Sequence, residues 1–265
     1  MSHSTQTPSR SEMIYPDSDG LPMAENTLQF EWITTIKGGL DALFRDRPDV
    51  FVAGDLLWYP LEGDNTTRVA PDALVAFGRP KGYRGSYMQW VENGIPPQVV
   101  FEVLSPGNRA GEMRRKLLFY ERFGVEEYYL YDPDAITLAG WRRAGDRLTT
   151  IPEMDGWISP RLGVRFELAD DALHLFGPDG RPFLTYVELA RERDDLTRER
   201  DDLTRERDDL TRERDEEQLR ADHMAQERDE ERLRANHMAR ERDEERLRTE
   251  RLAEQLRSLG IEPAT

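Results

Sequence analysis

The sequence predicts an α/β domain followed by one long charged helix. Aromatic residues occur up to Tyr186 and are absent after it, so only the first two thirds of the chain can bury a sizeable core. Helix-like and strand-like patterns alternate within that part, which is typical of an α/β fold. From Ala190 the pattern changes, and the unit Arg-Glu-Arg-Asp-Asp-Leu-Thr occurs three times in succession, starting at Arg191, Arg198 and Arg205.

The first part of the core begins with a predicted helix. Apolar residues recur at helical spacing between Glu25 and about Arg45, among them Trp32, Ile36 and Leu40. Three strand-like runs follow, at 50–59, 72–77 and 98–104.

The second part of the core begins with a helix expected at 109–123, with Asn108 as its N-cap and Gly124 just past its end. A buried strand is expected at 126–131, before Asp132-Pro133. Shorter β runs at 136–143, 147–151, 164–168, 172–176 and 182–186 are expected to form an extra β layer.

The chain is divided accordingly into four predicted segments. Residues 1–12 are polar and predicted to be disordered, 13–187 form the globular domain, 188–258 form the charged helix, and 259–265 are a tail.

The charged helix has a recurrent apolar position. Leu189, Leu196, Leu203 and Leu210 are seven residues apart and are continued in phase by Met224, Met238, Leu252 and Leu259. If these occupy position d of a heptad, Arg193, Arg200, Arg207 and Arg214 occupy position a. One good core residue per heptad is a weak coiled-coil seam. Segment 188–258 is therefore a homo-oligomeric coiled coil, a helix for another partner, or a single solvated helix.

Composition excludes some classes of function. The chain has no cysteine, which rules out disulfides and thiolate sites. It shows neither a secretory leader nor an apolar run of membrane-spanning length, so we expect a cytoplasmic protein without membrane contact. The net charge is −16, with both parts acidic, which disfavours a broad nucleic-acid-binding surface.

Three charged residues stand out against apolar surroundings. Glu102 lies in Val-Val-Phe-Glu-Val-Leu, a run typical of a central strand. An ionised carboxylate there is costly unless it is paired, hydrogen-bonded or bound to a metal, and a simple ion pair with an arginine or an exit at the strand end would also suit it. Asp72 opens an apolar strand directly after a proline, which also suits a simple turn. Lys116 falls on the inward stripe of the second helix, where it either extends its ammonium to solvent or meets an acidic partner.

These residues resemble a family motif. The chain is similar to the Uma-two family of putative restriction endonucleases over roughly 13–187. The similarity is carried by Pro71-Asp72, Glu102 to Pro106, Lys116 and the stretch 123–133, whose sequence is FGVEEYYLYDP. The resemblance implies a PD-(D/E)xK fold: a restriction-endonuclease-like mixed sheet flanked by helices, with additional β strands and the long helix. It also implies catalytic roles for Asp72, Glu102, Lys116 and, more weakly, Glu25. The usual lysine position is Leu104 here, and Lys116 takes its place from the next helix.

The resemblance further implies a metal-dependent reaction. Asp72, Glu102 and the carbonyl of Val103 would hold Mg²⁺ or Mn²⁺, and the substrate would be DNA. Two alternatives remain. The chain is also compatible with an inactive nuclease-fold protein that assembles through its C-terminal helix. A glycosidase with paired carboxylates fits less well, because nothing specific to sugar binding is present.

Overall fold

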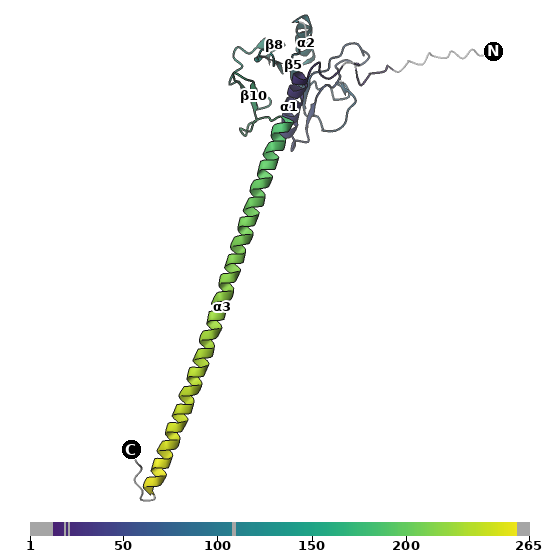
Figure 1. Ribbon diagram of the computed structural model, residues 1–265. Coiled ribbons are helices and arrows are strands. Elements are labelled where there is room, and N and C mark those ends of the chain that lie inside the picture. The colour runs from purple at the N-terminus through teal and green to yellow at the C-terminus, as the bar shows by residue number, and fades with distance from the viewer. Residues whose placement is uncertain (1–12, 19, 21, 108–109, 259–265) are drawn as a thin grey trace, which may run out of the picture. The chain divides into compact units, whose positions relative to one another are not determined.

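The computed structural model describes residues 13–18, 20, 22–107 and 110–258 (Figure 1). The chain divides into two compact units, with the boundary between Arg191 and Glu192. The tails expected at 1–12 and 259–265, and the helix cap expected at Asn108, lie outside the described residues.

The core is built on a six-stranded mixed sheet, as the predicted fold class requires. Its strands are β1 (Val50–Ala53), β3 (Ala73–Phe77), β5 (Val99–Val103), β6 (Glu127–Asp132), β7 (Thr137–Ala144) and β8 (Arg147–Thr150), adjacent in that order. Strands β5 and β6 run parallel, and the other neighbours run antiparallel. Central strand β5 is buried along its whole length, which explains its continuous apolar sequence.

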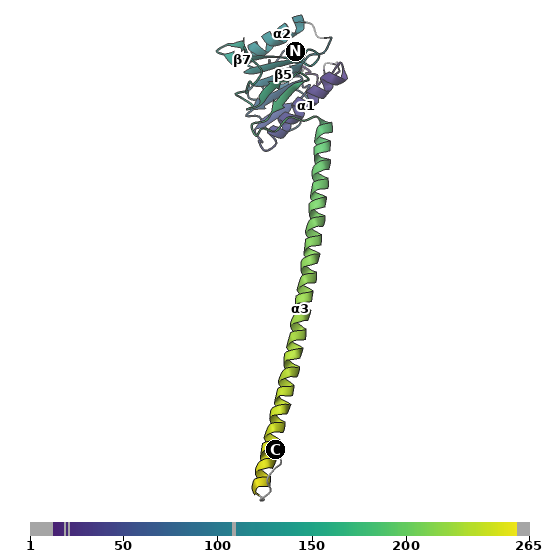
Figure 2. The same ribbon diagram turned by 60° about the vertical axis from the view of Figure 1, so that its left-hand side comes forward.

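Two helices cover the two faces of this sheet (Figure 2). Helix α1 (Thr27–Leu43) buries Ile33, Ile36 and Leu40 in one apolar cluster, and its N-cap Asn26 accepts a hydrogen bond from the N–H of Gln29. Helix α2 (Ala110–Phe123) contributes the fully buried Tyr120 to the other cluster. Residues of β5 alternate between the clusters, so consecutive side chains of this strand face different helices.

The strand expected at 50–59 is two short strands. After β1 the chain turns at Gly54-Asp55, where Asp55 has a positive φ of 48°. The second piece, β2 (Trp58–Tyr59), pairs in parallel with β4 (Tyr87–Met88) in a separate two-stranded sheet. A run of apolar residues does not reveal such a bend, because its composition stays strand-like on both sides of it.

The late β runs do not all form an extra layer. Strands β7 and β8 extend the main sheet, whereas β9 (Arg165–Leu168) and β10 (Leu173–Phe176) form a hairpin that packs on the α1 side. The strand predicted at 182–186 is wrong. Pro182 makes only an isolated bridge, and Thr185 and Glu188 form reciprocal hydrogen bonds that begin the long helix.

Helix α3 (Tyr186–Ser258) is a single helix of 73 residues. Ion pairs between residues three or four apart, such as Arg198 with Asp195, line its surface. Within the described part of the chain, no helix combines the length and the apolar character needed to cross a bilayer.

Candidate active site

The candidate site lies where the start of β3 meets the end of β5. The antiparallel register that sets Ala73 opposite Phe101 brings the next residues, Asp72 and Glu102, level with each other. Leu74 and Val100, two residues away on the same strands, belong to the α2-side cluster, so both acids face α2. The Asp72 carboxylate accepts the N–H of Val103 at 2.6 Å, which ties the two strand ends together.

Glu102 is held by two groups from α2. Its side chain is only 2% exposed, and one carboxylate oxygen accepts a hydrogen bond from Lys116 Nζ at 2.7 Å. The other oxygen accepts the hydroxyl proton of Tyr120, which lies one helical turn after Lys116. The structure therefore brings Asp72, Glu102 and Lys116 together. Tyr120 was not predicted from the sequence as a site residue, although a residue four positions after Lys116 lies on the same face of the helix.

The site has unusual electrostatics. Burial and, next, the charge of Glu102 raise the pKa of Asp72 well above its ordinary value, against the opposing effects of Lys116 and the Val103 N–H. Burial alone would lower the pKa of Lys116, but the charge and hydrogen bond of Glu102 outweigh it, and the net pKa is raised. Burial and Glu102 also raise the pKa of Tyr120. Lys116 is therefore a stable ammonium and Tyr120 a stable phenol donor at neutral pH.

Glu25 and Gln29 approach the end of β5 from the α1 side. The Glu25 carboxylate accepts a hydrogen bond from the hydroxyl of Ser105 and lies so close to Gly107 that a Cβ there would be 2.2 Å from its Oε2. Gln29 accepts the N–H of Glu25 at 2.8 Å and donates its amide N–H to the Val103 carbonyl at 2.8 Å. Gln29 was not predicted. It engages one lone pair of the carbonyl that the sequence suggested as a metal ligand.

A third carboxylate, also missed in the sequence, is near Asp72. The charge of Asp55 contributes to raising the pKa of Asp72, and the Asp55 N–H donates to the carbonyl of Pro71 at 3.1 Å. Asp55 occupies the turn that separates β1 from β2. Across the described residues, no group of three or more His, Asp or Glu side chains is arranged so that it could hold a metal ion. A cation at this site would therefore complete its coordination with carbonyl, water or substrate oxygens.

Comparison with known proteins places the chain in a family. The model of Uma2, described as "Putative restriction endonuclease", matches residues 24–173, more than half of the chain, so this protein belongs to the Uma2 family. The resemblance drawn from the sequence motifs is thereby confirmed. Glu25, Asp72, Glu102 and Lys116 all lie inside the matched region, and α3 lies outside it.

A crystal structure of a putative nuclease belonging to DUF820 from Anabaena variabilis ATCC 29413 is similar, with 17% sequence identity and a TM-score of 0.39. The similarity covers 51% of this chain and 72% of that one. No curated protein matches the chain.

Proposed function

We propose that the core is a metal-dependent DNA endonuclease in which Asp72, Glu102 and Lys116 form the catalytic centre. Membership of the Uma2 family supports a nuclease. The observation that carries the proposal is the buried Glu102–Lys116 pair beside a second buried acid, Asp72. A structural ion pair needs two charges of opposite sign, and an extra carboxylate beside it is costly to bury. That cost is consistent with a site for a cation.

The residues present suit Mg²⁺ or Mn²⁺. Asp72 and Glu102 supply carboxylate oxygens on one face of the sheet, and the Val103 carbonyl lies at the same strand end. Hard divalent cations prefer such oxygen ligands. Burial first, and then the charges of Glu102 and Asp55, raise the pKa of Asp72, and a cation would relieve the repulsion among these carboxylates. When bound, the cation would activate water and neutralise charge on the scissile phosphate.

The protein's own groups have separable roles in this proposal. Lys116 holds a positive charge at the site, where it orients the attacking water and stabilises negative charge on phosphate oxygens. Tyr120 and Lys116 fix the orientation of Glu102. Gln29 fixes the Val103 carbonyl. Ser105 and Gly107 set the position of Glu25, the further acid, which approaches the end of β5 from the α1 side.

The alternative is an inactive nuclease-fold protein that assembles through α3. Both oxygens of Glu102 already accept hydrogen bonds from protein groups, which favours a purely structural pair. The net charge of −16 also opposes general attraction to DNA. Under this alternative the core neither cleaves DNA nor binds a divalent cation.

Cleavage of supercoiled plasmid DNA distinguishes the nuclease from the inactive nuclease-fold protein. We expect wild-type protein to convert the plasmid to nicked or linear forms with Mg²⁺ or Mn²⁺ and to be inactive with EDTA. Asp72→Asn and Lys116→Met should lose activity by about a hundredfold or more. Arg115→Met is the matched control, because Arg115 is an exposed cation next to Lys116 on α2. Equal activity of wild type and Asp72→Asn would refute the proposal.

A further inference from the structure

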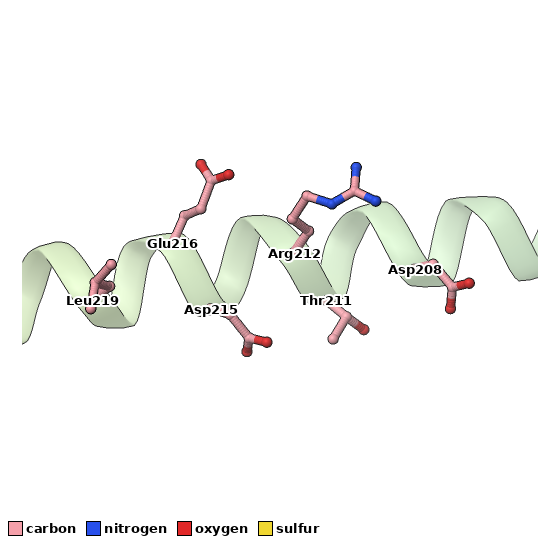
Figure 3. A pocket seen from close by; sticks show the side chains of 6 residues that line it. All are labelled: Asp208, Thr211, Arg212, Asp215, Glu216 and Leu219. Carbon is pink, nitrogen blue, oxygen red and sulfur yellow. The ribbon is translucent and has the colours of Figure 1, made fainter.

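Helix α3 carries an exposed apolar series with a strict seven-residue phase. Each member is more than half exposed: Leu189, Leu196, Leu203, Leu210, Met224, Met238 and Leu252. Such a phase drifts by about 20° per heptad around a straight helix and stays on one side only when two helices supercoil. Leu219, Leu233 and Leu247 occupy heptad position f, on the opposite side. The hollow in Figure 3 is formed by side chains of α3 alone and offers no enclosed ligand site.

Acidic residues occupy the remaining d positions of this series, and arginines occupy the a positions before them. In the d positions, Glu217, Glu231 and Glu245 stand between the apolar residues. Three residues before each of them, at position a, is an arginine: Arg214, Arg228 and Arg242. Three residues before each methionine of the series, at position a, is an alanine: Ala221 before Met224 and Ala235 before Met238.

This pattern discriminates between the two orientations of a helix pair. A parallel pair sets a against a and d against d. Arg228 would then face Arg228 of the second copy, and Glu231 would face Glu231. An antiparallel pair sets a against d, so an arginine at position a meets a glutamate or an apolar residue at position d. The pattern is self-complementary in the antiparallel orientation and self-repelling in the parallel one.

One antiparallel register satisfies all the central layers. When Arg228 lies opposite Glu231 of the second copy, Arg214 lies opposite Glu245 of the second copy and Arg242 opposite Glu217 of the second copy. The same register sets Ala221 against Met238 of the second copy and Ala235 against Met224 of the second copy, so that small residues meet large ones.

The flanking positions agree with this register. Antiparallel pairs bring g positions together, and here Glu227 meets Arg234 of the second copy. Likewise Glu213 meets Arg248 of the second copy, and Arg220 meets Glu241 of the second copy. We propose that α3 pairs with α3 of a second copy of this chain as an antiparallel coiled coil in this register. The occupant of the exposed apolar series is thus another molecule of the same protein.

Engineered cysteines test the orientation, since the chain has none of its own. Full-length A221C/M238C, oxidised at low protein concentration, should form a covalent dimer on a non-reducing gel. Each single variant, A221C or M238C, should not, because the residue opposite it is then not a cysteine. L233C is the matched control on the opposite side of the helix. Efficient cross-linking of M238C alone would indicate parallel helices and overturn the proposal.

The register is tested by a second pair. L210C/A235C aligns only if the helices are shifted by two heptads, and its cross-linking in place of A221C/M238C would overturn the stated register. A monomeric mass of the wild-type chain by light scattering at every concentration would overturn pairing altogether.

Charge reversal gives a test that needs no cross-link. Sedimentation equilibrium of R228E should show a dimer weakened by about tenfold or more, because two glutamates then face glutamates across the symmetric pair. R228E/E231R restores opposite charges across the antiparallel layer and should recover the wild-type dissociation constant. In a parallel pair the double variant still sets like charges together. Failure of the double variant to recover would therefore contradict the antiparallel orientation.

Discussion

Replacing Lys116 by methionine removes the ammonium from a glutamate that is only 2% exposed. The loss of a charge-assisted hydrogen bond costs about 1.5–3 kcal/mol. Breaking a buried ion pair by removing one partner costs about 3–5 kcal/mol in total, because the other charge stays buried. Tyr120 still donates to Glu102, and the Lys116 side chain is 20% exposed. We therefore expect the lower end, a loss of about 3 kcal/mol in the free energy of unfolding of the core.

The coupling between the two residues is the quantity to measure. E102Q/K116M removes both charges and keeps an acceptor for Tyr120, so it should cost only about 1 kcal/mol. Urea unfolding followed by tryptophan fluorescence reports the core alone, because all five Trp residues precede α3. If the K116M loss were fully additive with that of E102Q, or if K116M were as stable as wild type, the buried pair described here would be refuted.

Three further predictions concern neighbouring groups. Asp72→Asn should stabilise the metal-free core at pH 8. Burial raises the pKa of Asp72 in the folded state, so the stability of the wild type falls as the pH rises from the unfolded-state pKa through the folded-state pKa. Asparagine does not ionise and escapes this loss, while it still accepts the hydrogen bond from the Val103 N–H. Thermal unfolding against pH tests this, and a less stable variant at pH 8 would contradict it. Gly107→Ala should displace the Glu25 carboxylate and lower plasmid cleavage by about tenfold, with an unchanged melting temperature. Gly111→Ala is the control, because a Cβ there meets no other atom, and it should leave cleavage unchanged. Equal cleavage rates for the two variants would argue against a role for Glu25. Gln29→Leu should cost about 1–3 kcal/mol in urea unfolding, since it leaves the buried Val103 carbonyl without its partner, and a neutral effect would mean that this carbonyl is satisfied in another way.

Much of the candidate site could be predicted from local periodicity. Side chains of a strand alternate between its two faces, which places Glu102 on the same face as Val100. The helical period places Lys116 on the same face of its helix as Tyr120. Neither period says which strands are neighbours. The meeting of Asp72 with Glu102 depends on the β3–β5 register, which is a long-range property of the sheet.

The missed residues are those that act across the fold or at a bend. Gln29 and Val103 are 74 residues apart, and nothing local to either predicts their hydrogen bond. Asp55 reaches Asp72 through a turn with positive φ inside an apolar run that was assigned to one strand. The strand predicted at 182–186 is wrong, and a local signal in the sequence opposes it. Thr185 and Glu188 form a capping box, which begins a helix and outweighs the strand-like composition.

Calorimetric titration of Mn²⁺ into the wild type and Asp72→Asn tests the central proposal most directly. The variant keeps the Val103 hydrogen bond and should be the more stable protein without metal, so a loss of binding cannot be attributed to unfolding. We predict saturable binding of Mn²⁺ at millimolar concentration to the wild type and none to the variant. Equal binding by the two proteins, or no binding by either, would contradict a cation site at Asp72 and Glu102.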